Sequence, residues 1–170
     1  MNLKKNLVFL GMMGSGKSSI GYLVSKKLNL SFIDIDNLIE AKTNMTIAEI
    51  FKEKGEDHFR VIEKKITLKT LKNIGAVVSL GGGGFINNEI RKEVLTNHFS
   101  FWLDWEDSIL LKRIKDSKKR PLAFQLKDQQ IRQLIKKRLK IYSKAQFKIN
   151  CNKLTKTEIV KKIIKIYEIN

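Results

Sequence analysis

A phosphate-binding motif near the start of the chain constrains the fold more than any other feature of the sequence. Residues 11–18, Gly-Met-Met-Gly-Ser-Gly-Lys-Ser, fit the pattern G-x-x-x-x-G-K-[ST] at every fixed position. The apolar run 7–10 before the motif predicts a buried parallel strand, and the apolar periodicity of residues 18–30 predicts a helix. A strand, a glycine-rich loop and a helix in this order are the context in which the motif holds a nucleoside triphosphate.

The residue types of this loop explain how it would hold phosphates. Glycines let successive backbone N–H groups turn toward one anion, and the following helix adds the positive end of its dipole. We expect Lys17 to reach the β- and γ-phosphates and the Ser18 hydroxyl to bind Mg²⁺, which prefers oxygen ligands. The predicted nucleotide-binding residues of the loop are Gly11, Gly14, Ser15, Gly16, Lys17, Ser18 and Ser19.

Strand and helix patterns alternate along the rest of the chain. Further strands are expected at 32–35, 76–80, 99–103 and 147–151, and further helices at 47–54, 56–73, about 88–95, about 107–114, 128–145 and 155–167. Thr46 and Glu49 predict a capping box, and Gly55 is expected to end the helix that follows it. The alternation predicts a three-layer α/β/α sandwich with a five-stranded parallel sheet, a P-loop NTPase fold. Trp102 and Trp105 are expected in the core and at its edge.

Length and charge limit the classes of function. With 170 residues the chain is expected to form one domain, 1–170. Lys+Arg number 34 against 17 Asp+Glu, a formal charge of +17, but the lysines are spread along the whole chain and no basic block alternates with aromatic residues. We therefore expect anionic small-molecule substrates and no nucleic-acid partner. The apolar stretch 7–10 is too short for a secretory signal, and the one cysteine, Cys151, excludes an internal disulfide. A cytoplasmic protein without a membrane partner is expected.

Two aspartates after the second predicted strand narrow the chemistry. Asp34 and Asp36 lie two apart, so in an extended segment both would project to one side, at the strand end where ligands bind in open α/β sheets. They could serve a Mg²⁺-bound water and a substrate hydroxyl, or they could be two solvated loop carboxylates. The guanine motif N-K-x-D is missing from 152–155, and Asp104, which resembles a Walker B aspartate, is expected to cap the next helix. A small-molecule kinase is the remaining interpretation.

Several motifs together resemble the shikimate kinases. They are the phosphate loop, Phe32-Ile33-Asp34-Ile35-Asp36, Gly55 to Glu63 with its Phe-Arg-x-x-Glu segment, Ser79-Leu80-Gly81-Gly82-Gly83, Arg120-Pro121-Leu122, and Arg138 followed by Tyr142. The resemblance runs from the phosphate loop to Tyr142. It implies a nucleoside monophosphate kinase-like fold with a substrate-binding helical segment at about 36–63 and a mobile lid at about 115–127.

The resemblance also implies a reaction and a set of roles. The reaction is ATP-dependent phosphorylation of shikimate to shikimate 3-phosphate, in aromatic amino acid biosynthesis, with Mg²⁺ and ATP as co-substrate. The implied catalytic residues are Lys17, Asp36 and Arg120. The implied shikimate-binding residues are Asp36, Arg60, Gly81, Gly82, Gly83 and Arg138, with Glu63 orienting Arg60. Arg113 and Arg120 would contact ATP, and Asp34 would reach the metal through water. The protein is expected to act as a monomer.

The residues themselves support this reading to different degrees. Arginine binds planar carboxylates through two parallel hydrogen bonds, so Arg60 and Arg138 suit a monocarboxylate substrate. Arg60 and Glu63 lie within reach on one helix face, which is equally typical of a surface ion pair. A gluconate or nucleoside monophosphate kinase would share the phosphate loop but should lack the two arginines with the glycine run. A nucleotide-switched RNA-binding protein would instead use the positive charge.

Overall fold

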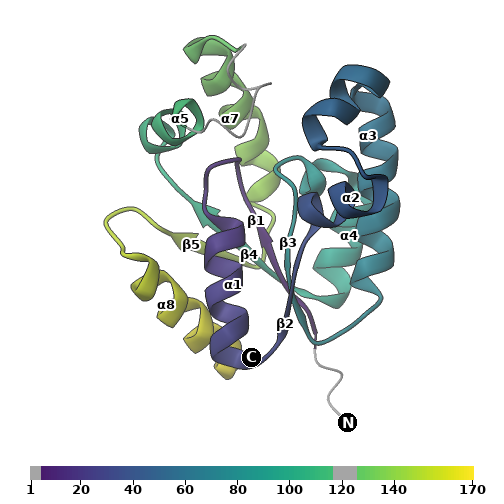
Figure 1. Cartoon of the computed structure of the whole chain (residues 1–170). Coiled ribbons are helices and arrows are strands. Elements are labelled where there is room, and N and C mark those ends of the chain that lie inside the picture. Colours follow the sequence, from purple (N-terminus) through teal and green to yellow (C-terminus); the bar gives the residue numbers. More distant parts are fainter. Residues whose placement is uncertain (1–4, 117–125) are drawn as a thin grey trace.

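A parallel sheet between two helical layers forms the centre of the computed structural model, which describes residues 5–116 and 126–170 (Figure 1). The strands are β1 (Leu7–Leu10), β2 (Ser31–Asp34), β3 (Ala76–Ser79), β4 (Phe99–Asp104) and β5 (Phe147–Asn150). All neighbouring strands pair in parallel, in the order β2-β3-β1-β4-β5. The helices are α1 (Lys17–Leu28), α2 (Ile35–Thr43), α3 (Ile47–Leu71), α4 (Asn88–Asn97), α5 (Asp107–Lys115), α7 (Asp128–Tyr142) and α8 (Lys156–Ile169), with a 3₁₀ turn η1 (Gly84–Ile86).

Alternation along β1 explains the three layers. Leu7 and Phe9 pack into a core with α1 and α8, whereas Val8 and Leu10 pack into a second core with α2, α3, α4 and α7. All four side chains are at most 1% exposed, and burying a side chain of this kind contributes about 1.5–3 kcal/mol. The strand is apolar throughout because both faces are covered, so the predicted three-layer sandwich is confirmed.

The chain between β2 and α3 contains one helix, α2, that the helix pattern of the sequence does not predict. β2 ends at Asp34, and the chain enters α2 at once because the Asp34 side chain caps it, accepting from the Asn37 N–H at 3.3 Å. The predicted extended geometry of Asp34 and Asp36 is therefore wrong: Asp36 lies in the first turn of α2. The predicted capping box of Thr46 and Glu49 is confirmed.

Gly55 interrupts α3 as expected. Its φ of 81° and ψ of 170° are non-helical, so the two predicted helices are halves of one kinked element. A positive φ of this size suits glycine, which has no Cβ to clash with its own carbonyl group. The kink comes just before the segment that carries Arg60 and Glu63.

The expected cap at Asp104 is also wrong. β4 continues through Asp104, which pairs in register with Asn150 of β5, and its carboxylate lies 3.0 Å from the Lys148 amine. The residue before α5 is Glu106, and no side chain caps that helix. Strand pairing with β5 holds Asp104 two residues away from the position where it could cap α5.

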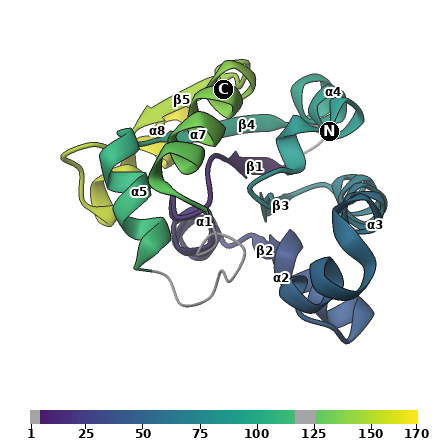
Figure 2. The same cartoon turned by 90° about the horizontal axis from the view of Figure 1, so that it is seen from above.

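The topology brings three loops to one edge of the sheet. β1, β2 and β3 are adjacent and parallel, so the segments that follow them leave the sheet at the same end. From above, α2 and α3 lie on one side of the start of α1, and α5 lies on the other (Figure 2). Within the described residues, no helix combines the length and apolar character needed to cross a bilayer.

Candidate active site

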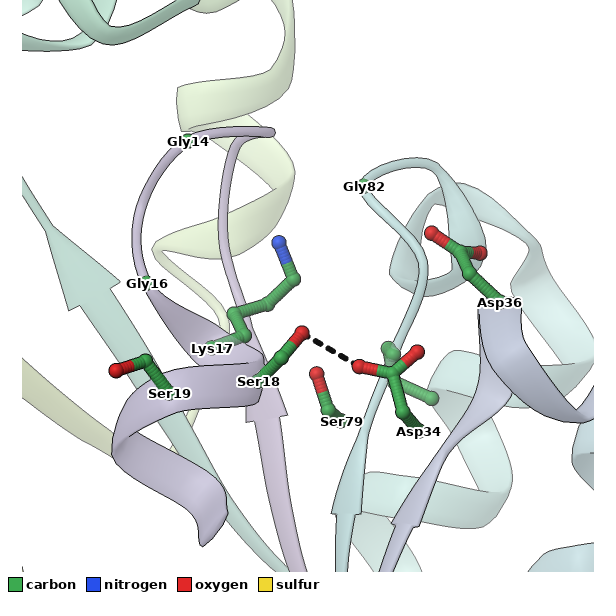
Figure 3. Close-up of a pocket in the computed structure, with 10 residues that line it drawn as sticks. Gly14, Gly16, Lys17, Ser18, Ser19, Asp34, Asp36, Ser79 and Gly82 are labelled. Atoms are coloured by element: carbon green, nitrogen blue, oxygen red, sulfur yellow. Dashed lines mark hydrogen bonds between the residues drawn. The ribbon is translucent and has the colours of Figure 1, made fainter. Parts of the chain in front are cut away.

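A cavity of about 250 Å³ opens at the carboxyl ends of β1, β2 and β3 (Figure 3). It lies between the loop that follows β1 and the segments that follow β2 and β3. The lining residues are Gly14, Gly16, Lys17, Ser18, Ser19, Asp34, Asp36, Ser79, Leu80 and Gly82. The structure therefore gathers the predicted phosphate loop, both aspartates and part of the glycine run around one space.

Glycine is required where the phosphate loop enters α1. Gly16 occupies the residue before the helix with a φ of 87°, in the left-handed region that glycine favours. The neighbouring Ser15 is 1% exposed, and its hydroxyl makes no hydrogen bond within the described residues. A buried hydroxyl of this kind needs a partner, and an anion held in the loop would provide one.

The lysine of the motif lies folded over the loop. Lys17 is buried, and its amine donates to the carbonyl oxygens of Gly11 and Met12, each at 2.9 Å. These bonds hold the positive charge beside the backbone that would surround the phosphates. In Figure 3 the amine lies across the cavity from Asp36.

Ser18 and Asp34 place a hydroxyl and a carboxylate side by side on the cavity wall. The Ser18 hydroxyl donates to Asp34 Oδ2 at 2.5 Å, a contact drawn in Figure 3. A hydroxyl and a carboxylate in contact suit a hard cation such as Mg²⁺. Within residues 5–116 and 126–170 no cluster of three or more His, Cys, Asp or Glu side chains could hold a metal.

Arg60 of α3 lies between two carboxylates of its own helix. Its Nη1 donates to Glu63 Oε2 at 2.7 Å, and its Nε and Nη2 donate to Glu56 Oε1 at 3.2 and 2.9 Å. A guanidinium carries five N–H groups, so these bonds leave one on Nη1 and one on Nη2. The edge formed by Nη1 and Nη2 is the fork through which a guanidinium can bind a planar carboxylate.

Burial distinguishes the two carboxylates that hold Arg60. The Glu63 side chain is 3% exposed and the Glu56 side chain 63%. Burial raises the pKa of Glu63, further helped by the charge of Asp36, although Arg60 and Arg138 oppose the rise. For Arg60 burial lowers the pKa, but Glu63 and Glu56 more than offset this and the pKa is raised overall. Arg60 is thus fixed in its charged form.

The glycine run lets the backbone approach these side chains closely. A Cβ on Gly81 would lie 2.6 Å from both Asp36 Oδ1 and Glu63 Oε1, and one on Gly83 would lie 2.4 Å from Arg60 Nη1. The sequence predicted a close approach to a ligand. The structure shows a close approach to the site's own charged groups, and a Cβ at either position would have to displace them.

Arg138 of α7 reaches the same loop from the other side. Its Nη1 donates to the Gly82 carbonyl at 3.1 Å, and the Tyr142 hydroxyl donates to the same oxygen at 2.5 Å. Burial raises the pKa of Tyr142, which therefore remains a neutral donor. Arg60 and Arg138 are 78 positions apart in sequence, yet they lie beside successive residues of the glycine loop, Gly83 and Gly82.

Two further predicted nucleotide-binding residues have different outcomes. Arg113 on α5 is exposed and lies with its Nη1 3.5 Å from the Gly14 carbonyl, beside the phosphate loop. Arg120 and most of the predicted lid, 115–127, lie outside the described residues.

Sequence reasoning assigned no role to Glu56, which accepts from Arg60, or to Trp105, whose indole N–H donates to the Ser15 carbonyl. The four-residue spacing of Glu56 and Arg60 on a helix could have signalled the first of these contacts. The second joins segments that are far apart in sequence, and no local spacing signals it.

Comparisons with known proteins place the chain among small-molecule kinases. The sequence model of the shikimate kinase family matches residues 13–168. A shikimate kinase of Thermodesulfovibrio yellowstonii is 38% identical over 165 residues, covering 96% of this chain and 95% of that protein. A structure of shikimate kinase from Acinetobacter baumannii in complex with shikimate superposes with a TM-score of 0.92 at 29% identity, covering 98% and 94%. The shikimate kinase structure from Aquifex aeolicus gives 0.85 at 35%, covering 96% of each chain.

Proposed function

The chain belongs to the shikimate kinase family, and from this premise we propose that it transfers the γ-phosphoryl group of ATP to a ring hydroxyl of shikimate, giving shikimate 3-phosphate and ADP. One observation carries the proposal beyond family membership. Two arginines converge on the glycine loop at the side of a cavity whose other wall is a phosphate-binding loop. The arginines suit a carboxylate-bearing acceptor, and the phosphate-binding loop suits a nucleoside triphosphate.

The arginines would bind the carboxylate of shikimate. Arg60 offers the fork on Nη1 and Nη2, and Glu63 and Glu56 hold its plane. Arg138 would contribute a second cation, and the backbone N–H groups of the glycine loop would add donors. Because the guanidinium is already held before substrate arrives, little conformational freedom is lost on binding.

Asp36 would position the hydroxyl that attacks the phosphorus. Its carboxylate lies on the cavity wall across from the phosphate loop (Figure 3). A carboxylate there can accept a hydrogen bond from the hydroxyl and take its proton as the new P–O bond forms. Lys17 would neutralise negative charge on the transferring group, because phosphoryl transfer depends mainly on positioning and charge stabilisation.

Mg²⁺ is part of the proposal, and the oxygen ligands of the cavity fit it. Ser18 would bind it directly and Asp34 through water. When bound, the ion would neutralise negative charge on the phosphates. Arg113 would lie against the adenine base. Arg120 and the lid remain predictions from the resemblance, since they lie outside the described residues.

The remaining expectations concern the whole protein. Residues 1–170 would form a single kinase domain in which 36–63 bind the acceptor. The protein is proposed to act as a monomer. A cytoplasmic location is proposed because the reaction consumes ATP. Nucleic acid is not proposed as a partner.

Acceptor-dependent ADP release tests the reaction. The purified protein is supplied with Mg-ATP and shikimate, gluconate, AMP, CMP or no acceptor. We expect ADP release with shikimate alone and shikimate 3-phosphate as the product by mass spectrometry. Release with gluconate or a nucleoside monophosphate instead would refute the proposal, and so would ATP binding without any acceptor-dependent release.

A further inference from the structure

One tryptophan connects two separate parts of the nucleotide site. Trp105, just after β4, donates its indole N–H to the Ser15 carbonyl at 2.9 Å. The face of the same ring lies 3.8 Å from the guanidinium carbon of Arg113. The indole therefore contacts both the phosphate loop and the arginine expected beside the base.

The position of Trp105 is fixed from several directions. Its side chain is partly buried and packs against both hydrophobic cores. The residues on either side are bonded to the segment after β5: the Asp104 carbonyl accepts from the Cys151 N–H at 2.9 Å, and the Glu106 N–H donates to Asn152 Oδ1 at 3.0 Å. A ring held in this way can orient a flexible neighbour.

The bond to Ser15 has a directional consequence for the phosphate loop. A trans peptide unit is planar, so its carbonyl and N–H groups point in opposite directions. The Ser15 carbonyl points to the indole, and the Gly16 N–H of the same peptide unit therefore points away from it. Because Gly16 lines the cavity, this orientation favours an N–H group directed at a phosphate.

The contact with Arg113 has a consequence for the base. Arg113 is exposed, and a long exposed side chain samples many rotamers. A guanidinium over an aromatic face is held by the ring quadrupole. Arg113 remains exposed in this contact, which leaves guanidinium surface for an adenine ring to stack on.

We propose that Trp105 is a positioning residue for the nucleotide, with its ring orienting Arg113 toward the base and its N–H orienting the phosphate loop. The inference rests on the proposed use of ATP. It is independent of the acceptor, because neither contact involves the arginines of α3 and α7 or the glycine loop.

Two variants and two ligands separate the two actions of the indole. Trp105→Phe keeps an aromatic face and removes the N–H donor, whereas Trp105→Leu removes both. The ligands are ATP and inorganic tripolyphosphate, which lacks a base, and their affinities are measured by calorimetry. We expect Trp105→Phe to weaken both ligands about threefold. Trp105→Leu should weaken ATP a further two- to fivefold, roughly, without any further loss for tripolyphosphate.

Steady-state kinetics give the second readout. KM for ATP should rise in both variants, and more in Trp105→Leu than in Trp105→Phe. KM for shikimate should stay within about twofold of the native value. Equal losses of ATP and tripolyphosphate in Trp105→Leu would refute the orientation of Arg113, and equal rises of both KM values would show that Trp105 merely stabilises the fold. Either result would overturn the inference.

Fluorescence tests the inference without a variant of Trp105. In Trp102→Phe, Trp105 is the one remaining tryptophan. Saturating ATP should change the emission of Trp105, because the adenine base would stack on the Arg113 guanidinium that contacts its ring. Shikimate alone should leave the emission nearly constant. An unchanged emission, with ATP binding verified by calorimetry, would refute the role. ATP binding and this emission change without shikimate turnover would refute the proposed reaction and leave the role of Trp105 standing.

Discussion

The two glutamates that hold Arg60 provide a matched pair for testing how the site binds its acceptor. Both accept from the same guanidinium, but Glu63 is buried and Glu56 is exposed. Glu63→Gln keeps the size of the side chain and exchanges a charged acceptor for a neutral one. A hydrogen bond to a charged group contributes about 1.5–3 kcal/mol. In the variant the charged guanidinium of Arg60 still donates to the amide oxygen, but the charge of the acceptor is lost, and with it roughly half of this contribution. The variant should lose about 1–1.5 kcal/mol of this interaction.

That loss corresponds to a fall of about tenfold in kcat/KM for shikimate. The fall should appear mainly in KM for shikimate, with KM for ATP unchanged, because Arg60 lies away from the phosphate loop. Glu56→Gln is the control, and an exposed pair four residues apart on a helix contributes about 0.3–0.5 kcal/mol, or roughly a twofold change. Initial rates of ADP release, measured while the concentrations of shikimate and ATP are both varied, give KM for each substrate in each of the two variants. Equal effects of the two variants, or an equal change in KM for ATP, would refute the argument from burial.

Four other predictions follow from the same geometry. Burial raises the pKa of Glu63, so as pH falls this carboxylate takes up a proton at a higher pH than an ordinary glutamate. KM for shikimate in the native protein should therefore rise as the pH falls through that range. In Glu63→Gln, which lacks the titrating group, this rise should be missing. Asp36→Asn should bind ATP normally by calorimetry and abolish transfer, and full activity would disprove its role. Gly83→Ala should raise KM for shikimate at least about tenfold, because the new Cβ would displace Arg60; an unchanged KM would contradict the close approach. Burial, with a smaller contribution from Asp104, raises the pKa of Cys151 to about 12, so a colorimetric disulfide reagent at neutral pH should label this thiol only after denaturation.

Periodicity and spacing were sufficient for most of the fold. The five strands, the strand–loop–helix order at residues 7–28 and the capping box at Thr46 are determined by neighbours in the sequence, and the structure confirms them. The local reading was wrong where one residue has two plausible uses. Asp34 ends a strand and also caps a helix, and the two-residue spacing to Asp36 concealed the start of α2.

Contacts between distant segments were harder to predict. The resemblance named Arg60 and Arg138 as partners, and the glycine loop brings them together. The close approach of Gly81 and Gly83 to the site's own side chains arises only in the folded chain, so spacing in the sequence does not predict it. The contacts of Trp105 with Ser15 and Arg113 join three segments through a single ring, and no spacing in the sequence could have signalled them.

Two arginines are proposed to recognise a carboxylate on the acceptor while Asp36 aligns its hydroxyl. Comparing shikimate with its methyl ester tests this most directly, because the ester keeps every ring hydroxyl while a methyl group replaces the negative charge. ADP release is measured with each compound in the native protein and in Arg138→Met. The native protein should prefer shikimate over the ester by at least about a hundredfold in kcat/KM, because two charge-assisted contacts are lost in the ester. Arg138→Met should reduce this preference at least about tenfold, because it removes one of the two cations. Equal use of the ester by the native protein would contradict the proposed recognition of the carboxylate.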